Sequence, residues 1–195
     1  MRDLRLLTIA VSAMVVIDAL WNPVVLSYGA LFPAAFRSHL LPIASIVDGS
    51  ASIFKLATMV LFAVWIYFAG ANLREADVDD LEFSPASRIW WFFVPVASLF
   101  KPFQGMRELW NASLNRWPHD ENAAVVTIWW VTYLLTSFAA LFVIYSGQVA
   151  GTHLTALWVQ SLTAMVRAVF AIIILRGVAT AQRRFDGSSL SEVFA

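Results

Sequence analysis

The segment RIWWFFVPVASLFKPFQGMRELW, residues 88–110, decides the architecture of this chain. It begins like a membrane-spanning helix, but Pro95 lies inside it and Lys101-Pro102 ends its apolar part. The uncharged stretch from Ile89 to Phe100 would extend only about 18 Å as a helix, against about 30 Å of hydrocarbon in a bilayer. Apolar runs of this length are typical of re-entrant, interfacial or buried segments. Whether this segment crosses a membrane fixes the topology of everything that follows it.

The composition is that of a multi-pass membrane protein. Of the 195 residues, 60% are hydrophobic and only 13% are charged, whereas a soluble domain has about 25% charged residues. The formal net charge of +0 gives no positive field of the kind that binds nucleic acid. The chain has 0 cysteines, which excludes disulfides, thiolate metal sites and cysteine nucleophiles.

Four other segments are long and apolar enough to span a bilayer. The first contains Asp18, the second contains Lys55 and the fourth contains Arg167, whereas the third is free of charge. They run over residues 6–26, 51–73, 123–145 and 154–175. The sequence therefore predicts an all-α integral membrane protein with four transmembrane helices in a single membrane domain, residues 1–195.

The lysines and arginines indicate whether residues 88–110 cross the membrane. If the segment returns to the side it entered and the N-terminus is cytoplasmic, Arg37 is the one basic residue in an external loop, and nearly all the others are cytoplasmic. If it crosses, the majority becomes external. The positive-inside rule favours the first arrangement. We therefore expect both termini in the cytoplasm and a proline-broken re-entrant or interfacial helix within about residues 85–117, between the second and third spans.

A second, amphipathic helix is predicted after Lys101. Its apolar residues recur at helical spacing and form one stripe, and polar residues form a second stripe beside it. The apolar stripe contains Phe103, Met106, Trp110, Leu114 and Trp117, and the polar stripe contains Gln104, Glu108, Asn111 and Asn115. This pattern is typical of a helix that lies in the membrane interface, here on the cytoplasmic side.

The stretch from Asn72 to Trp110 resembles a bacterial family of multi-pass membrane proteins known as domain of unknown function 4328. The resemblance rests on Asn72, the Phe83-Ser84-Pro85 turn, the WFFVPV block at 91–96 and the KPFQGMRELW motif at 101–110. It implies a protein of the bacterial cytoplasmic membrane. It implies no activity, substrate or cofactor.

Three ionisable residues lie within the predicted spans: Asp18, Lys55 and Arg167. Charges inside a bilayer are costly, and they mark functional sites or pair with one another. The reach of an arginine allows Arg167 to meet Asp18, whereas Lys55 lies close enough to the outer boundary to snorkel. One hypothesis is an ion or proton site around Asp18 and Arg167. A structural pair that fixes helix packing is favoured, because no further relay residues accompany it.

The interfacial motif is the second candidate site. It comprises Pro95, Lys101, Pro102, Gln104, Arg107, Glu108 and Trp110. One hypothesis is a polar site that binds a lipid headgroup or a partner through Lys101 and Arg107. The other is that Glu108 and Arg107 pair with Arg88 or Arg74 and hold the re-entrant segment in place. The sequence favours neither.

An acidic loop precedes this motif and contains Asp77, Asp79, Asp80 and Glu82. Carboxylates at such spacing can hold Mg²⁺ or Ca²⁺. The loop lacks the glycine and the regular ligand positions of a calcium-binding loop. We therefore predict a solvated loop and no metal site.

No nucleophilic serine constellation, phosphate loop or zinc-binding motif is found, so we predict no catalytic residue and no cofactor. The leading hypothesis is a non-enzymatic scaffold, regulator or accessory subunit that contacts membrane lipids and forms a homo-oligomer or joins a larger membrane complex. One alternative is a small transporter or channel with a polar site at Asp18 and Arg167. Another is a membrane-embedded lipid-acting enzyme that uses Glu108 or the acidic loop.

Overall fold

The computed structural model describes residues 1–118, 122–146 and 152–193. Most of this part of the chain is helical, and no strand occurs in it. The four long helices are α1 (Arg5–Leu31), α3 (Ala44–Glu75), α6 (Ala124–Ser146) and α7 (Thr152–Val193). The predicted all-α fold is confirmed.

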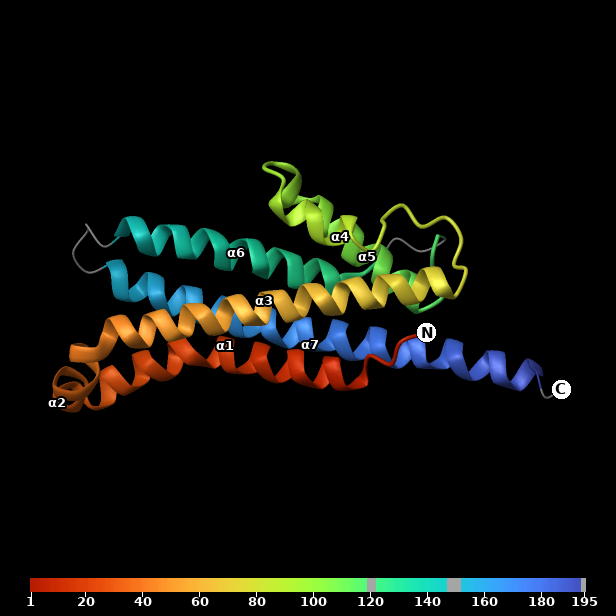
Figure 1. The fold of residues 1–195 in the computed structure, drawn as a ribbon. Coiled ribbons are helices and arrows are strands. Elements are labelled where there is room, and N and C mark those ends of the chain that lie inside the picture. The colour runs from red at the N-terminus through yellow and green to blue at the C-terminus, as the bar shows by residue number, and fades with distance from the viewer. Residues whose placement is uncertain (119–121, 147–151, 194–195) are drawn as a thin grey trace.

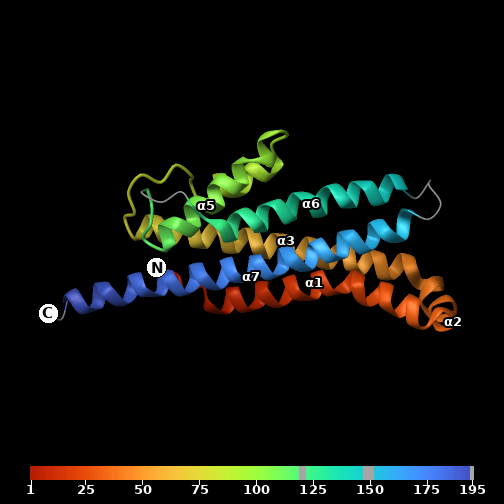
Figure 2. The same cartoon turned by 180° about the vertical axis from the view of Figure 1, so that it is seen from behind.

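The four long helices lie side by side in an elongated bundle (Figure 1). α7 packs along both α1 and α6, and α1 also packs against α3, as the view from behind shows (Figure 2). Each helix is long and apolar enough to cross a membrane, with candidate spans at Arg5–Leu31, Pro33–Glu75, Ala124–Tyr145 and His153–Arg184. These candidates match the four predicted spans.

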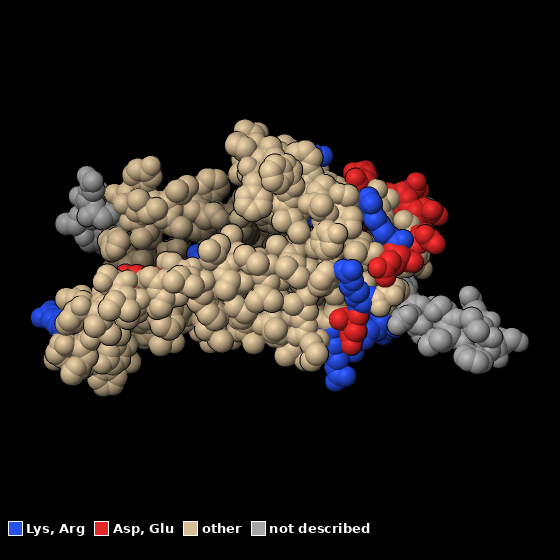
Figure 3. All heavy atoms as spheres, in the orientation of Figure 1, with Lys and Arg blue, Asp and Glu red and all other residues tan. Residues whose placement is uncertain are grey.

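Charged side chains gather at one end of the bundle, the end where the N-terminus lies (Figure 3). We call this the charged end, and the opposite end, where α2 (Pro33–Ala35) lies, the far end. The outer faces of the long helices carry large exposed apolar side chains such as Leu6, Ile53 and Ile144. Such faces suit contact with hydrocarbon, because helices satisfy their own backbone hydrogen bonds.

Several helix boundaries differ from the predicted ones. α3 begins at Ala44, and the region before it, expected to be a loop, forms α2, η1 (Phe36–Leu40) and η2 (Leu41–Ile43). Pro33 is the first residue of α2 and Pro42 the second residue of η2, positions whose backbone N–H has no partner within the helix, so the missing N–H of proline costs nothing. At the other end of the chain, α7 continues well beyond its predicted end at residue 175.

The segment between α3 and α6 doubles back on itself and rejoins the bundle near the charged end (Figure 1). Its outgoing arm is α4 (Ser87–Trp90) and η3 (Trp91–Phe93), and its returning arm is η4 (Ala97–Leu99) and α5 (Lys101–Ser113). We call residues 84–113 the hairpin and residues 94–96 its tip. Val94 is extended, as expected of a residue before proline, and Val96 has a φ of 63°.

The returning arm α5 packs against α3, α6 and α7. It differs from the expected interfacial helix, because its polar stripe faces inward: Glu108 and Asn111 are both buried. Met106 from the apolar stripe is buried with them, whereas Phe103 and Trp110 are only half-buried. The polar stripe faces inward because Arg88 on α4 forms an ion pair with Glu108 there.

The hydrophobic core is concentrated where α5 meets α3 and α7. Its fully buried large side chains include Trp65, Ile66, Leu73, Met106, Leu109, Ile174 and Leu175. A buried hydrogen bond from Trp65 Nε1 to Thr8 Oγ1, at 2.9 Å, joins α3 to α1. The hairpin is therefore part of the core of the molecule at its base.

Candidate functional site

The first turn of the hairpin positions Arg88. The Ser87 backbone N–H donates to Ser84 Oγ at 3.0 Å, and the Ser87 hydroxyl donates to the Ser84 carbonyl, also at 3.0 Å. Together these bonds close the turn in the manner of a helix cap. The side chain of Arg88, the next residue, is buried.

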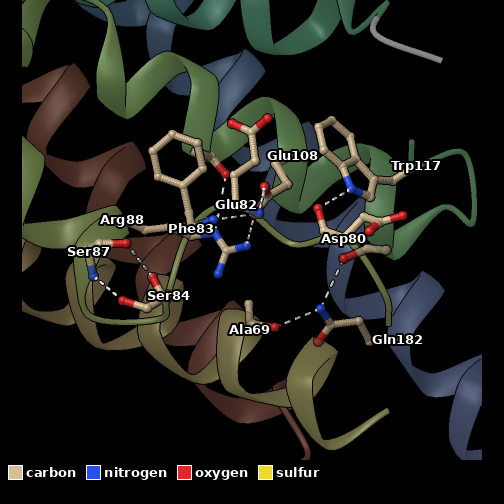
Figure 4. A network of polar contacts seen from close by, with 12 residues as sticks. Ala69, Asp80, Glu82, Phe83, Ser84, Ser87, Arg88, Glu108, Trp117 and Gln182 are labelled. Atoms are coloured by element: carbon tan, nitrogen blue, oxygen red, sulfur yellow. Dashed lines mark hydrogen bonds and ion pairs between the residues drawn. The ribbon is translucent and has the colours of Figure 1, made fainter. Parts of the chain in front are cut away.

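Arg88 and Glu108 form an ion pair that joins the two arms of the hairpin (Figure 4). Both side chains are only 1% exposed. The carboxylate of Glu108 also accepts hydrogen bonds from the backbone N–H groups of Glu82, at 2.7 Å, and Phe83, at 3.3 Å. Arg88 Nε donates to the Gly105 carbonyl at 3.3 Å. The pair therefore connects α4, α5 and the end of the acidic loop.

Two glycines make room for Arg88. A Cβ at Gly70 on α3 would lie 2.6 Å from Arg88 Nη1, and a Cβ at Gly105 would lie 3.3 Å from Arg88 Cγ. Within the described residues, Nη1 is buried and has no hydrogen-bond partner. The guanidinium group thus lies tightly packed between α3 and α5.

Burial favours the neutral form of each partner and shifts its pKa accordingly. Desolvation lowers the pKa of Arg88, against the attraction of Glu108. Desolvation raises the pKa of Glu108 above its ordinary value, although Arg88 and the two backbone N–H donors oppose the shift. A buried ion pair of this kind contributes little net stability, but removal of one partner is costly.

A second polar cluster joins the base of the hairpin to the rest of the bundle. Gln182 Nε2 on α7 donates to the Ala69 carbonyl on α3, at 3.0 Å, and to Ser113 Oγ on α5, at 2.9 Å. Asn72 Nδ2 donates to Gln182 Oε1 at 3.0 Å. Asn72 Oδ1 accepts from the backbone N–H of Arg2 at 2.8 Å. Three helices and the N-terminal segment therefore meet at one buried cluster.

Both arms of the hairpin are connected to α6 next to the tip, through aromatic residues. Trp130 Nε1 donates to the Leu99 carbonyl at 2.9 Å. The ring of Phe92 makes edge contacts with Trp130 and Tyr133, with centroid distances of 6.1 and 6.3 Å. These contacts fix the direction in which the hairpin leaves the bundle.

The ionisable residues of the predicted spans are only partly brought together. Arg167 Nη2 lies 3.7 Å from Asp18 Oδ2, and each side chain is 20% exposed. Lys55 is exposed on α3 and takes no part in this ion pair. The structure therefore joins α1 and α7 through Asp18 and Arg167 and leaves Lys55 apart.

The interfacial motif is dispersed over the hairpin. Its two cations lie over aromatic rings: Lys101 Nζ is 5.6 Å from the centre of the Phe83 ring, and Arg107 is 5.7 Å from that of Phe103. Pro95 is exposed at the tip, Pro102 is buried at the start of α5, and Gln104 is half-buried. Trp110 packs on α7. Of this motif, Glu108 alone belongs to the buried ion pair, as one of the two hypotheses anticipated.

The acidic loop forms a shallow pocket at the charged end, with a volume of about 440 Å³. It is lined by Arg74 together with Asp77, Asp79 and Asp80. Trp117 Nε1 donates to the Asp80 carbonyl at 3.0 Å and thereby ties the loop to the chain beyond α5. Among the residues that the structure describes, no three His, Asp or Glu side chains are arranged to hold a metal ion.

Sequence reasoning missed Gln182, Ser113 and Trp130. A signal for Gln182 was present, because the buried residues Leu175, Val178 and Ala179 continue at helical spacing toward it. For Trp130 no such signal exists, since its partner is a backbone carbonyl thirty-one residues away.

The comparisons with known proteins give a family and no activity. The model of the family described as "Domain of unknown function (DUF4328)" matches residues 38–190. This range contains the hairpin, the Arg88–Glu108 pair, the long helices α3 and α6 in full, and all but the last three residues of α7. No curated protein matches the chain, and no solved structure matches it.

Proposed function

Because the chain belongs to this family of unknown function, membership assigns it no activity, and we propose a function from the hairpin itself. The chain acts as a non-enzymatic scaffold or accessory subunit in the bacterial cytoplasmic membrane. Both termini are cytoplasmic, and the hairpin enters the cytoplasmic leaflet and returns. Its tip is the surface that a protein partner covers.

The observation that carries this proposal is the exposed apolar surface of the non-helical tip and of the residues just before it. Trp90, Phe93 and Val96 are between 66% and 72% exposed, so this part of the hairpin is strongly apolar on its outside. Irregular backbone at membrane depth is found where protein or a water-filled cavity covers it, because lipid cannot satisfy its N–H and C=O groups. An apolar tip in the leaflet therefore favours a protein cover over lipid.

Contacts at the base of the hairpin and near its tip support the same function. The Arg88–Glu108 pair and the Trp130–Leu99 hydrogen bond hold both arms in one position before any partner binds. A surface that is already ordered loses less conformational entropy on binding. The lipid-acting enzyme is disfavoured, because the Glu108 carboxylate is buried and its oxygens are bound by Arg88 and two backbone N–H groups.

The topology is tested by cysteine accessibility, since the native chain contains no cysteine. Single cysteines replace the exposed residues Arg37 and His153 at the far end and Ala86 and Arg116 at the charged end. A membrane-impermeant thiol reagent added to spheroplasts should label positions 37 and 153 alone. Labelling at position 116 would show that the hairpin crosses, and the proposal would then be wrong.

The partner is tested by photo-crosslinking in native membranes. A benzophenone amino acid replaces Phe93, which directly precedes the tip, or, as a matched control, Phe138 on the outer face of α6; both phenylalanines are exposed. We expect a discrete protein adduct from position 93 that is absent from position 138. Adducts with lipid alone at both positions would contradict a scaffold function.

The Asp18–Arg167 ion pair favours a second candidate, a small transporter or channel. An ion pair in the middle of two spans suits a water-filled path. Neither the acidic-loop pocket nor the groove between α1 and α7 is lined by Asp18 or Arg167. A cysteine at position 18 that reacts with the impermeant reagent would favour a transporter or channel. An unreactive cysteine would favour the scaffold function.

A further inference from the structure

A groove with a volume of about 720 Å³ runs between α1 and α7 on the outside of the bundle. At the charged end it is lined by three arginines, Arg5, Arg176 and Arg183, all of them exposed. Farther along it is lined by Val16, Ile17 and Ile172. The groove is therefore basic at one end and apolar at the other. Its volume lies in the range of about 300–1,000 Å³ found for ligand pockets.

Small side chains hollow the floor of this groove. Ser12 on α1 and Ala179 on α7 lie in its lining and are almost completely buried. The hydroxyl of Ser12 is buried and, within the described residues, has no hydrogen-bond partner. Because the floor is made of short side chains, the larger apolar residues form walls and not a flat face.

The charge of the groove selects an anion. Its lining contains three arginines and no Asp or Glu. Arg176 and Arg183 stand seven residues apart on α7, which is about two helical turns, so they lie on the same side of the helix. Arg5 donates to the Asp3 carboxylate through its backbone N–H and not through its guanidinium group. Arg183 Nη2 donates to the hydroxyl of Thr180, which is uncharged. Neither bond therefore neutralises a guanidinium group.

Arg176 is the arginine of this groove that most needs a counter-ion. It is exposed and lies next to the end of the predicted fourth span, at residue 175. A cation at the edge of the hydrocarbon is favourable where it reaches the interface and pairs with an anion there. A lipid phosphate at the membrane surface supplies the missing charge, and the acyl chains of the same molecule cover the apolar part of the groove.

We propose that the groove between α1 and α7 is a binding site for one acidic phospholipid. Its phosphate lies among Arg5, Arg176 and Arg183, and an acyl chain lies along Val16, Ile17 and Ile172. Basic pockets between transmembrane helices bind anionic headgroups on the same physical grounds. This site is separate from the hairpin and goes beyond the scaffold function.

The test measures which lipid contacts the groove. A single cysteine at Ile9, which lines the groove, is labelled with bimane; a cysteine at Ile128 is the control. Each is the fifth residue of a helix that begins near the charged end, and both are exposed, at 59% and 41%. The labelled chains are reconstituted into phosphatidylcholine vesicles that contain brominated phosphatidylglycerol or brominated phosphatidylcholine, which quench nearby bimane.

We expect brominated phosphatidylglycerol to quench position 9 at much lower mole fraction than brominated phosphatidylcholine, and both lipids to quench position 128 equally. Arg176→Gln should weaken the preference about fivefold, which corresponds to the roughly 1 kcal/mol that one cation near an anionic surface contributes. Arg176→Lys should largely preserve it. Arg37→Gln, at the far end, is the control and should leave it unchanged.

Two results would overturn the proposal. The first is equal quenching of position 9 by the two brominated lipids in a chain whose thermal unfolding is normal. The second is protection of bimane at position 9 from both lipids together with a disulfide between two unlabelled cysteine-9 chains treated with an oxidant, which would show that a second copy covers the groove. Melting curves of every variant distinguish loss of lipid binding from loss of folding.

Discussion

Gly177 on α7 lies directly against the ring of Trp110 on α5. A Cβ at Gly177 would come within 2.5 Å of Trp110 Cζ3 and 2.7 Å of Cη2. Carbon atoms that are not bonded prefer separations of about 3.5–4.0 Å, so any larger residue at this position must displace the indole. The contact explains why Trp110 packs on the bundle although it belongs to a stripe expected at the membrane interface.

Gly177→Ala should therefore destabilise the chain. Overpacking costs about 1–3 kcal/mol, and the better helix propensity of alanine returns at most about 1 kcal/mol of it. The matched control is Gly49→Ala on α3, where a Cβ meets nothing within 4 Å. Thermal unfolding in detergent should show a lower Tm for Gly177→Ala and an unchanged or higher Tm for Gly49→Ala. Equal effects of the two substitutions would contradict the packing described here.

Loss of one partner of the Arg88–Glu108 pair should be among the most damaging single changes. Arg88→Met leaves a buried carboxylate, and Glu108→Leu leaves a buried guanidinium; each should lower the free energy of unfolding by about 3–5 kcal/mol. The double variant Arg88→Met/Glu108→Leu should lose much less than the sum. Reversible unfolding in mixed micelles, analysed as a double-mutant cycle, measures the coupling.

An exposed ion pair serves as the control for that cycle. The N-terminal amino group of Met1 lies 3.2 Å from Glu75 Oε2, and the Glu75 side chain is 46% exposed. Because water screens such pairs, Glu75→Gln should cost at most about 1 kcal/mol. If Arg88→Met cost no more than Glu75→Gln, the pair at the hairpin base would not be buried as described.

The raised pKa of Glu108 predicts a dependence of stability on pH. A carboxyl whose pKa is higher in the folded chain holds its proton more tightly there. Its contribution to the free energy of unfolding is therefore largest below its ordinary pKa of 4.5 and decreases as the pH rises through the raised pKa. Arg88→Met removes a cation that lowers this pKa, so the decrease should extend to higher pH.

The measurement is the Tm as a function of pH. The comparison is between Arg88→Met and Arg88→Met/Glu108→Gln, which cannot titrate at position 108. From pH 4.5 upward, the single variant should lose stability relative to the double variant. A difference in Tm that is constant over this range would show that Glu108 does not titrate as predicted.

Much of this fold could be predicted from the sequence because it depends on local properties. Hydropathy predicted the four long helices, and Pro95 within a 12-residue apolar run predicted that the helix would be interrupted there. An ion pair between Glu108 and Arg88 was among the hypotheses that the sequence left open, since Glu108 on a polar stripe needs a partner. These features depend on residue type and spacing within a single segment.

The missed features depend on contacts between segments. The inward turn of α5 follows from Arg88, which lies on another helix, and from Gly70 and Gly105, which make room for its side chain. The Trp130–Leu99 bond ends on a backbone carbonyl, which carries no residue-specific signal. Such contacts leave no periodic pattern in the sequence, so hydropathy and spacing do not reveal them.

Trp130→Phe should loosen the tip of the hairpin without unfolding the bundle. Phenylalanine keeps most of the aromatic contact with Phe92 but removes the donor to the Leu99 carbonyl, at a cost of about 0.5–1.5 kcal/mol. A spin label at the exposed Val96 should gain mobility in this variant. Trp21→Phe, on an exposed part of α1, is the control and should leave the label unchanged. An immobile label in both variants would mean that Trp130 does not position the tip.

Gln182→Leu tests whether the extension of α7 beyond its predicted end holds the hairpin base. The leucine fills a similar volume but leaves the Ala69 carbonyl, Ser113 Oγ and Asn72 Nδ2 without their buried partner. A buried polar group left unsatisfied costs about 1–3 kcal/mol, so the Tm should decrease clearly. Gln160→Leu in the same helix is half-buried and should be neutral or stabilising. If the two leucine variants melted alike, the cluster would contribute nothing, and α7 beyond residue 175 would not be needed to hold α3 and α5 together.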